Sequence, residues 1–348
     1  MYTPQNNQTN SYWTPKYPSG NMSKVLVTGA NGLLATNVIA ALLEKDYEVK
    51  GLLRDPAKYQ GPKNQKLELV DGDITNHKRM EEVLNDCKFV IHVAALTSQS
   101  ILKYATYEAV NVEATESLVQ LAIKKGVDKF VFVSSANAFG YGTREQPGTE
   151  EKPIKPPFSK SYYAISKAEA QKKVFKYQDQ IAVSVVNPTF MIGPYDGKPG
   201  SGQIILMGHK KRVIFSPPGG KNFVNATDAA KGVVAALEKG KNGQAYLLAG
   251  ENLSFRTFFQ KLSGAEVNHP LILTIPAFIL NTAGYFGNLL RLAGIKTQLS
   301  SINTKMLCIN NFYSSAKAQK ELGLEFENIE KGMNECIEWF RGVGMIDK

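Results

Sequence analysis

The segment from Lys24 to Ala35 constrains the fold more than any other part of the chain. It begins with a short apolar run, Val25 to Val27, of the kind that forms a buried β-strand. A turn containing Gly29 and Gly32 follows, and apolar residues then recur at helical spacing from Leu33 onward. This order places unpaired backbone N–H groups where a phosphate can approach. It predicts a site for the pyrophosphate of a dinucleotide, with an ordinary βα loop as the alternative.

The composition is that of a globular protein with one large domain and a smaller lobe, or two domains. The net charge of +10 is spread along the chain, which favours a lysine-rich exterior; anionic ligands or membrane surfaces are the alternative. No nucleic-acid motif is present, so no nucleic-acid partner is expected. The three cysteines and four histidines are scattered, so we expect no metal site and a reducing, cytoplasmic location.

Residues 1–21 are polar and lack the uninterrupted apolar stretch of a secretory signal, so we expect a disordered leader. Met22 is an alternative start. Strand signals at 25–27, 48–53, 67–70, 89–93 and 129–133 then alternate with helical segments, and a further strand is expected at 181–186. This alternation predicts an α/β fold with a Rossmann-type, doubly wound parallel sheet.

We expect a dinucleotide-binding domain over residues 22–250, with a loop excursion at about 190–222. A smaller, mainly helical substrate-binding lobe would follow over residues 251–348. The excursion is rich in Gly, Pro, Ser and Lys between positions 197 and 220, which is typical of loops.

The second expected strand ends at Arg54, and Lys58 follows closely. An acidic residue at this point binds the ribose hydroxyls of NAD, whereas arginine can pair with the 2′-phosphate of NADP. We therefore expect NADP to be preferred, with NAD as the alternative. The alternative is that Arg54 merely caps a surface strand and has no role in cofactor binding. Small residues after the fourth strand, Ala94 and Ala95, leave room for the same cofactor.

Tyr163 and Lys167 are four residues apart, which places both side chains on one face of a helix. The same spacing recurs at three other places in the chain, so the spacing alone proves little. Tyr163 differs because its segment follows a strand that ends in Ser134-Ser135. A tyrosine can protonate the alkoxide formed when a carbonyl accepts hydride, provided that its pKa of about 10 is lowered by a nearby cation.

The turn reads Thr-Gly-x-x-Gly-x-x-Ala and resembles the signature of the extended short-chain dehydrogenase/reductase family, with Ala35 in place of the third glycine. The nearest branch contains dihydroflavonol reductases and 3β-hydroxysteroid dehydrogenases, of the epimerase/dehydratase type. The resemblance implies that Tyr163 is the proton donor and that Lys167 holds the nicotinamide ribose. It also implies that Ser135 binds the substrate oxygen, because the spacing back from Gly140 matches the family.

The resemblance extends to the other residues around the cofactor. Asp73 and Ile74 would contact the adenine, Asn111 would fix the central sheet, and Pro188 would lie beside the nicotinamide. The full set of cofactor-binding residues implied is Gly29, Asn31, Gly32, Leu33, Leu34, Arg54, Lys58, Asp73, Ile74, Ala94, Ala95, Tyr163, Lys167, Pro188 and Thr189.

The stretch from Leu271 to Ile295 carries a single charge, Arg291, and bears on the substrate. Its prolines and asparagines argue against a bilayer span, so its apolar surface must meet the protein core, a hydrophobic substrate or a membrane interface. Sugar-nucleotide enzymes of the family have an arginine clamp where this chain has Lys221-Asn222.

The combined expectation is an NADP-dependent oxidoreductase that reduces a ketone, or oxidises the matching secondary alcohol, of a fairly hydrophobic small molecule. The alternatives are a nucleotide-sugar epimerase or dehydratase and a non-catalytic dinucleotide sensor. Peripheral membrane contact through about 271–295 and a homodimer both remain open.

Overall fold

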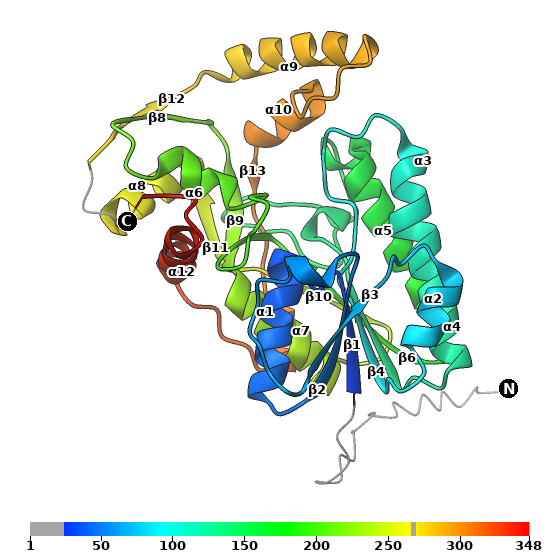
Figure 1. Cartoon of the computed structure of the whole chain (residues 1–348). Helices are drawn as coiled ribbons and strands as arrows, with labels where there is room; N and C mark the ends of the chain where they lie inside the picture. The colour runs from blue at the N-terminus through cyan, green and yellow to red at the C-terminus, as the bar shows by residue number, and fades with distance from the viewer. Residues whose placement is uncertain (1–23, 266–268, 348) are drawn as a thin grey trace, which may run out of the picture.

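A seven-stranded parallel sheet forms the centre of the computed structural model, which describes residues 24–265 and 269–347 (Figure 1). The strand order is β10-β6-β5-β4-β1-β2-β3. The strands are β1 (Lys24–Thr28), β2 (Glu48–Leu53), β3 (Leu67–Asp71), β4 (Phe89–His92), β5 (Lys129–Val133), β6 (Ala182–Pro188) and β10 (Gln244–Leu248). The order reverses between β1 and β4, the position where open sheets of this kind bind ligands. The predicted doubly wound parallel sheet is confirmed.

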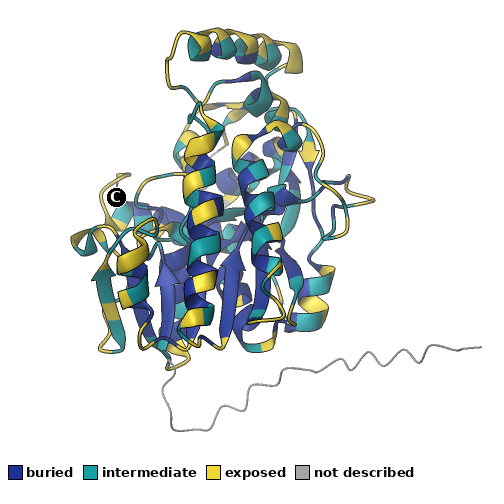
Figure 2. Cartoon of the chain, turned by 90° about the vertical axis from the view of Figure 1, so that its right-hand side faces the viewer, coloured by how far each residue is buried: buried dark blue, intermediate teal, exposed yellow. Residues whose placement is uncertain are grey.

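Helices cover both faces of this sheet, which explains why its central strands are apolar throughout. Val25 and Val27 pack in one core cluster, whereas Leu26 between them packs in the other. The first cluster lies under α1 (Leu33–Glu44) and α7 (Ala226–Lys239), and the second lies under α2 (His77–Val83), α4 (Ala114–Lys124) and α5 (Tyr162–Phe175). In Figure 2 the strands are almost entirely buried, and the helices expose only their outer ridges. The predicted leader, residues 1–21, and the alternative start at Met22 lie outside the described residues.

A smaller lobe stands beside the carboxyl edge of the sheet. Its core is aromatic, with Phe223 stacked on Phe258 at 4.3 Å between ring centroids and Phe340 fully buried nearby. Its strands are β7 (Phe190–Ile192), β8 (Val213–Ser216), β9 (Gly220–Asn225), β11 (Glu251–Ser254), β12 (Leu271–Thr274) and β13 (Asn310–Asn311). Its helices are α6 (Gln203–Gly208), α8 (Phe255–Ala265) and α12 (Ile329–Gly342), while α11 (Ala316–Leu322) packs back against α7. The lobe therefore draws on chain segments from both sides of β10.

The apolar stretch around 271–295 forms β12 and the projecting helix α9 (Ala277–Leu292), with α10 (Ser301–Leu307) beneath it (Figure 1). Burial in the protein core, one of the expected roles for this stretch, is wrong for α9. Its buried positions are Gly284 and Gly287, which pack against the segment leading into α10, so its large apolar side chains face outward. No helix among the described residues is long and apolar enough to cross a membrane.

Candidate active site

The predicted site residues lie together because nearly all of them follow a strand of the parallel sheet at its carboxyl end. Between them they cover the exits of six adjacent strands: Gly29 after β1, Arg54 after β2, Asp73 after β3, Ala94 after β4, Ser135 after β5 and Thr189 after β6. Carboxyl ends of parallel strands meet at one edge, so residues 160 positions apart in the sequence form one site. Pro188, the last residue of β6, belongs to the same edge.

The glycine turn has the shape expected of a phosphate cradle. Gly29 has φ +72°, and a Cβ added there would come within 3.0 Å of the backbone of Ala94. Gly32 begins α1 without a side-chain cap, so the first N–H groups of the helix, including those of Leu33 and Leu34, are not capped by a side chain. The exposed Asn31 lies between the two glycines. A close backbone approach and an uncapped helix end fit a pyrophosphate group.

The exit of β2 presents a cation to solvent. Arg54 is exposed, whereas Asp55 is engaged locally: its carboxylate caps the turn at Ala57 and forms an ion pair with Lys58 at 2.7 Å. The bond to Lys58 lowers the pKa of Asp55. Asp55 is therefore already paired with Lys58, whereas Arg54 interacts electrostatically with Asp73 at the exit of β3.

Asp73 and Ile74 lie just beyond β3. Asp73 accepts hydrogen bonds from the backbone N–H and the hydroxyl of Thr75, at 2.9 and 2.7 Å, and these bonds lower the pKa of its carboxyl. Asp73 therefore caps its own turn, and Ile74 packs at the edge of the core. Their contact with adenine stays a prediction.

Thr28 fixes the space between the turn and the exit of β4. Its hydroxyl accepts from the backbone N–H groups of Val93 and Ala94, both at 3.1 Å. It also bonds His92 Nδ1 at 2.8 Å, and His92 Nε2 bonds Thr115 at 2.9 Å. Complete burial lowers the pKa of His92 to about 3, so this histidine is neutral and structural.

Ser135 and Tyr163 form the reactive pair. Ser135 follows β5 and Tyr163 lies in the first turn of α5. The Ser135 hydroxyl accepts from the backbone N–H of Asn137 at 3.2 Å, and the same side chain acts on the phenol of Tyr163. Burial raises the pKa of Tyr163, and the bond from Ser135 opposes that rise. The neighbouring Ser134 is different, because its hydroxyl bonds the backbone carbonyl of Lys167 at 3.3 Å.

Lys167 lies below this pair but does not bond the phenol in the structure. Its buried Nζ donates to the Val133 carbonyl and lies 4.5 Å from the ring centroid of Phe132. Burial lowers the pKa of Lys167 to about 7. The expectation that Lys167 favours the phenolate stays a prediction, and in the cofactor-free structure Ser135 lowers the pKa of the phenol.

Two asparagines hold the backbone around the pair. Asn111 bonds the backbone N–H and carbonyl of Leu96 at 2.7 and 3.0 Å and donates to Ser166 at 3.0 Å, so it connects the exit of β4 to α5. Asn187 donates to the Ser135 carbonyl at 2.9 Å. Sequence reasoning missed this second contact, although a polar residue ending an apolar buried strand was a usable signal.

A cavity of about 290 Å³ lies between the start of α5, the end of α9 and the start of α10, and its lining includes Ser161 and Tyr162, which directly precede Tyr163 in the chain. Its lining is largely apolar, and Arg291 and Lys160 supply its charges. Arg291 donates to the carbonyls of Gln99 and Thr297, so it joins α9 to the loop after β4. Tyr107, also in the lining, interacts electrostatically with both Arg291 and Tyr163. Sequence reasoning did not find this cavity, because four distant segments form it.

Thr189 and Asn222 close the site near β10. The Thr189 hydroxyl donates to the Asn222 side chain at 2.7 Å, and the Asn222 amide donates to Gly250 and Asn252. Asn222 is thus fully engaged within the protein, at the point where related sugar-nucleotide enzymes are expected to have an arginine clamp.

This fold and this order of motifs define an NAD(P)-dependent oxidoreductase of the extended short-chain dehydrogenase/reductase type. The sequence model described as "NAD dependent epimerase/dehydratase family" matches residues 25–249. The chain therefore belongs to the NAD-dependent epimerase/dehydratase family.

Relatives within this family have different activities. The chain is 28% identical to a putative dihydroflavonol 4-reductase of Synechocystis, over 92% of this chain and 95% of that protein. It is 26% identical to a 3-beta-hydroxysteroid dehydrogenase of Mycolicibacterium neoaurum, over 92% of each chain. It is 31% identical to the dTDP-D-glucose 4,6-dehydratase of Mus musculus, over 66% of this chain and 69% of that protein.

Solved structures agree with the fold. The crystal structure of gox2253 superposes with a TM-score of 0.78 at 29% identity, and covers 94% of this chain and 100% of its own. A UDP-glucose 4-epimerase from Thermotoga maritima superposes with a TM-score of 0.71 at 21% identity, over 92% of this chain and 99% of its own.

Proposed function

We propose that this protein is an NADP-dependent oxidoreductase that reduces a ketone of a fairly hydrophobic small molecule, or oxidises the matching secondary alcohol. The observation that carries the proposal is the pairing of the Ser135 and Tyr163 side chains, with Lys167 buried one helical turn after Tyr163 and a largely apolar cavity lined by the adjacent Ser161 and Tyr162.

The residues divide the chemistry as follows. The bound nicotinamide supplies or accepts the hydride. Ser135 holds the carbonyl oxygen by a hydrogen bond, and Tyr163 gives that oxygen a proton as hydride reaches the carbon. In the oxidative direction Tyr163 removes the same proton. Lys167 binds the ribose and, when protonated, lowers the pKa of the phenol.

The preference for NADP rests on Arg54. Its guanidinium is exposed at the end of β2, and the adjacent carboxylate of Asp55 is already paired with Lys58. Arg54 can therefore bind the 2′-phosphate of NADP at this point. The carboxylate of Asp55, which could otherwise bind the ribose hydroxyls of NAD, is already paired with Lys58.

The hydrophobic substrate rests on the cavity. Its apolar lining includes Ile101, Leu102 and Ile302, which can contact a nonpolar ring system. A nucleotide-sugar epimerase or dehydratase is the second candidate, favoured by the dTDP-D-glucose 4,6-dehydratases among the relatives. The engaged Asn222 argues against it, because its amide is not free to bind a diphosphate.

One assay separates these functions. Purified protein is mixed with NADPH or NADH and with panels of apolar ketones and of UDP-, GDP- and dTDP-sugars, while absorbance of the reduced cofactor and product formation are followed. We expect NADPH to be consumed with ketones only. Sugar product without net consumption of cofactor would establish the second candidate, and cofactor binding without any turnover would establish the sensor.

The proton donor is tested with Tyr163→Phe, which should abolish turnover and leave NADPH binding intact. Tyr177→Phe, which removes a phenol near the other end of the same helical region, is the matched control and should keep full activity. Retained turnover in Tyr163→Phe would contradict the assigned role.

A further inference from the structure

The two-stranded sheet of β8 and β12 has an apolar outer face. Its cross-strand neighbours Leu271 and Val213 are 59% and 45% exposed, and the next outward pair, Leu273 and Phe215, is 42% and 61% exposed. The residues between them on each strand point inward and are buried. A strand with one face in water normally alternates apolar and polar residues, so this outer face lacks the polar side chains that water requires.

Helix α9 continues this apolar face directly after β12. Phe278, Phe286 and Leu289 are 70%, 59% and 62% exposed, and they share one side of the helix. We call these residues, together with the four outward residues of β8 and β12, the apolar crest. α9 is the outermost helix of the molecule in Figure 1, and Figure 2 shows that its outer side is exposed.

The opposite side of α9 is fixed by glycine. A Cβ added at Gly284 would lie 2.2 Å from the Thr304 hydroxyl, and one added at Gly287 would lie 2.3 Å from the Leu299 carbonyl. Only a helix surface without side chains fits this closely against α10. Rotation of α9 about its axis to bury its phenylalanines would therefore separate it from α10. The two glycines thus fix which face of α9 is exposed.

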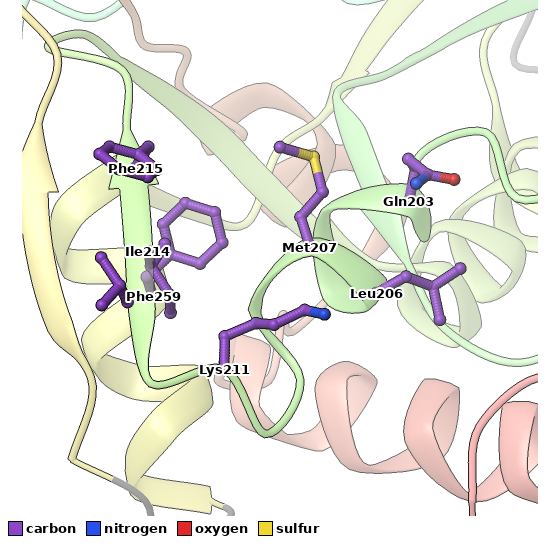
Figure 3. Close-up of a pocket in the computed structure, with 8 residues that line it drawn as sticks. Gln203, Leu206, Met207, Lys211, Ile214, Phe215 and Phe259 are labelled. Atoms are coloured by element: carbon purple, nitrogen blue, oxygen red, sulfur yellow. The ribbon is translucent and has the colours of Figure 1, made fainter.

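A shallow pocket adjoins the crest on the β8 side and shares Val213 and Phe215 with it. It measures about 390 Å³ and is lined by residues of α6, β8 and α8, with Met207 and Phe215 at its edge and Lys211 beside it (Figure 3). It contains none of the predicted site residues. The pocket widens the apolar surface beyond the two strands and brings a cation to its border.

The chain segments that form the crest carry charges of one sign. The sequence contains no Asp or Glu between positions 197 and 227 or between 267 and 320. Arg212 directly precedes β8, and Lys296 follows α9; both are exposed. An apolar face with a cationic border complements an anionic membrane surface, where apolar side chains enter the lipid and cations meet the headgroups.

We propose that the apolar crest docks this protein onto an anionic lipid bilayer, with α9 lying in the plane of the interface. A second copy of the chain is a poorer occupant, because a two-fold contact would bring the same cationic border against itself. α9 also supplies Arg291 and Leu292 to the cavity beside Tyr163, so docking would bring that cavity close to lipid-dissolved substrate. This last consequence rests on the proposed function, whereas the docking itself does not.

Vesicle flotation with the full chain tests the docking without any need for turnover. We expect the protein to float with vesicles of phosphatidylcholine and phosphatidylglycerol. Binding to phosphatidylcholine alone, or at raised salt, should be weaker. Phe286→Ser combined with Leu289→Ser should reduce binding about tenfold or more, because two exposed side chains lose their burial in lipid. Arg212→Glu combined with Lys296→Glu should remove the preference for anionic vesicles without changing the apolar face.

Val343→Ser combined with Met345→Ser is the matched control, since both residues are exposed apolar side chains outside the crest. This variant should float like the wild type. Wild-type protein that does not float with anionic vesicles would overturn the proposal, as would equal loss in the control pair. A wild-type dimer that the Phe286 and Leu289 changes convert to monomer, without vesicle binding by either, would show that the crest binds a second copy instead.

Discussion

Replacing Gly29 with alanine tests whether the glycine turn is a cradle or only a tight bend. Gly29 has φ +72°, a conformation that costs an L-residue about 1–2 kcal/mol. The added methyl would also lie 3.0 Å from the Ala94 backbone, which cannot move without disturbing β4. Overpacking of this kind costs about 1–3 kcal/mol more. We therefore expect Gly29→Ala to lower the free energy of unfolding by about 2–5 kcal/mol.

Gly126→Ala is the matched control. Gly126 has φ +70°, almost the same conformation, but a Cβ there would meet nothing within 4 Å. This variant bears the backbone strain alone, partly offset because alanine restricts the unfolded chain, so we expect a loss of about 1 kcal/mol. The difference between the two variants isolates the close approach of the turn to the exit of β4.

Urea unfolding without cofactor measures the stabilities, and fluorescence titration with NADPH measures binding. Gly29→Ala should raise the Kd for NADPH by about tenfold or more, because the methyl occupies space beside the helix end that a pyrophosphate needs. Gly126→Ala should leave the Kd unchanged. Equal destabilisation of the two variants, or an unchanged Kd in Gly29→Ala, would refute the reasoning.

Three further predictions concern the reactive pair and the cofactor. Ser135→Ala should reduce kcat by about 10²–10³ and move the alkaline limb of the rate profile upward, because Ser135 holds down the pKa of Tyr163, whereas Ser134→Ala should keep most activity. Arg54→Glu should change the ratio of kcat/KM for NADPH over NADH by about tenfold or more toward NADH, and an unchanged ratio would place the phosphate contact elsewhere. For Lys167, burial lowers the pKa to about 7, so the unfolded chain binds the extra proton between pH 7 and the ordinary lysine pKa. The cofactor-free protein should therefore gain stability as pH rises from about 7 to about 10. Lys167→Met should reduce that gain in unfolding measured across this range, and Lys129 and Lys221, whose pKa values burial also lowers, should supply the rest.

The parts of the site that the sequence predicted are those set by local rules. Val25 to Val27 are apolar because both faces of β1 are covered, and Gly29 is glycine because its φ is positive. Alternating strands and helices then require that the strand exits meet at one edge. Ser135 was chosen over Ser134 by spacing; in the structure Ser135 is the serine that lowers the pKa of Tyr163, whereas Ser134 bonds the Lys167 carbonyl, and the catalytic role of Ser135 stays a prediction.

The parts that the sequence did not predict depend on contacts between distant segments. The cavity joins the loop after β4 to the end of α9 through Arg291, a contact across 192 positions. The exposure of α9 depends on how closely Gly284 and Gly287 approach α10, which no local pattern encodes. Lys167 was expected beside the phenol, but its position is set by the Val133 carbonyl of the adjacent strand.

The cofactor turn and the phenol are parts of one hydrogen-bonded frame. Thr28, which precedes the turn, bonds His92, and the bonds continue through Thr115, Asn111 and Ser166 to the carbonyl of Tyr163. Burial lowers the pKa of His92 to about 3, so His92 is neutral near pH 7. The charge of this frame therefore does not change near neutral pH. Hydride transfer requires that the nicotinamide and the proton donor keep a fixed separation. The chain of buried, uncharged groups joins the cofactor turn to the helix that carries Tyr163. It therefore keeps the separation fixed throughout the pH range in which Tyr163 and Lys167 titrate.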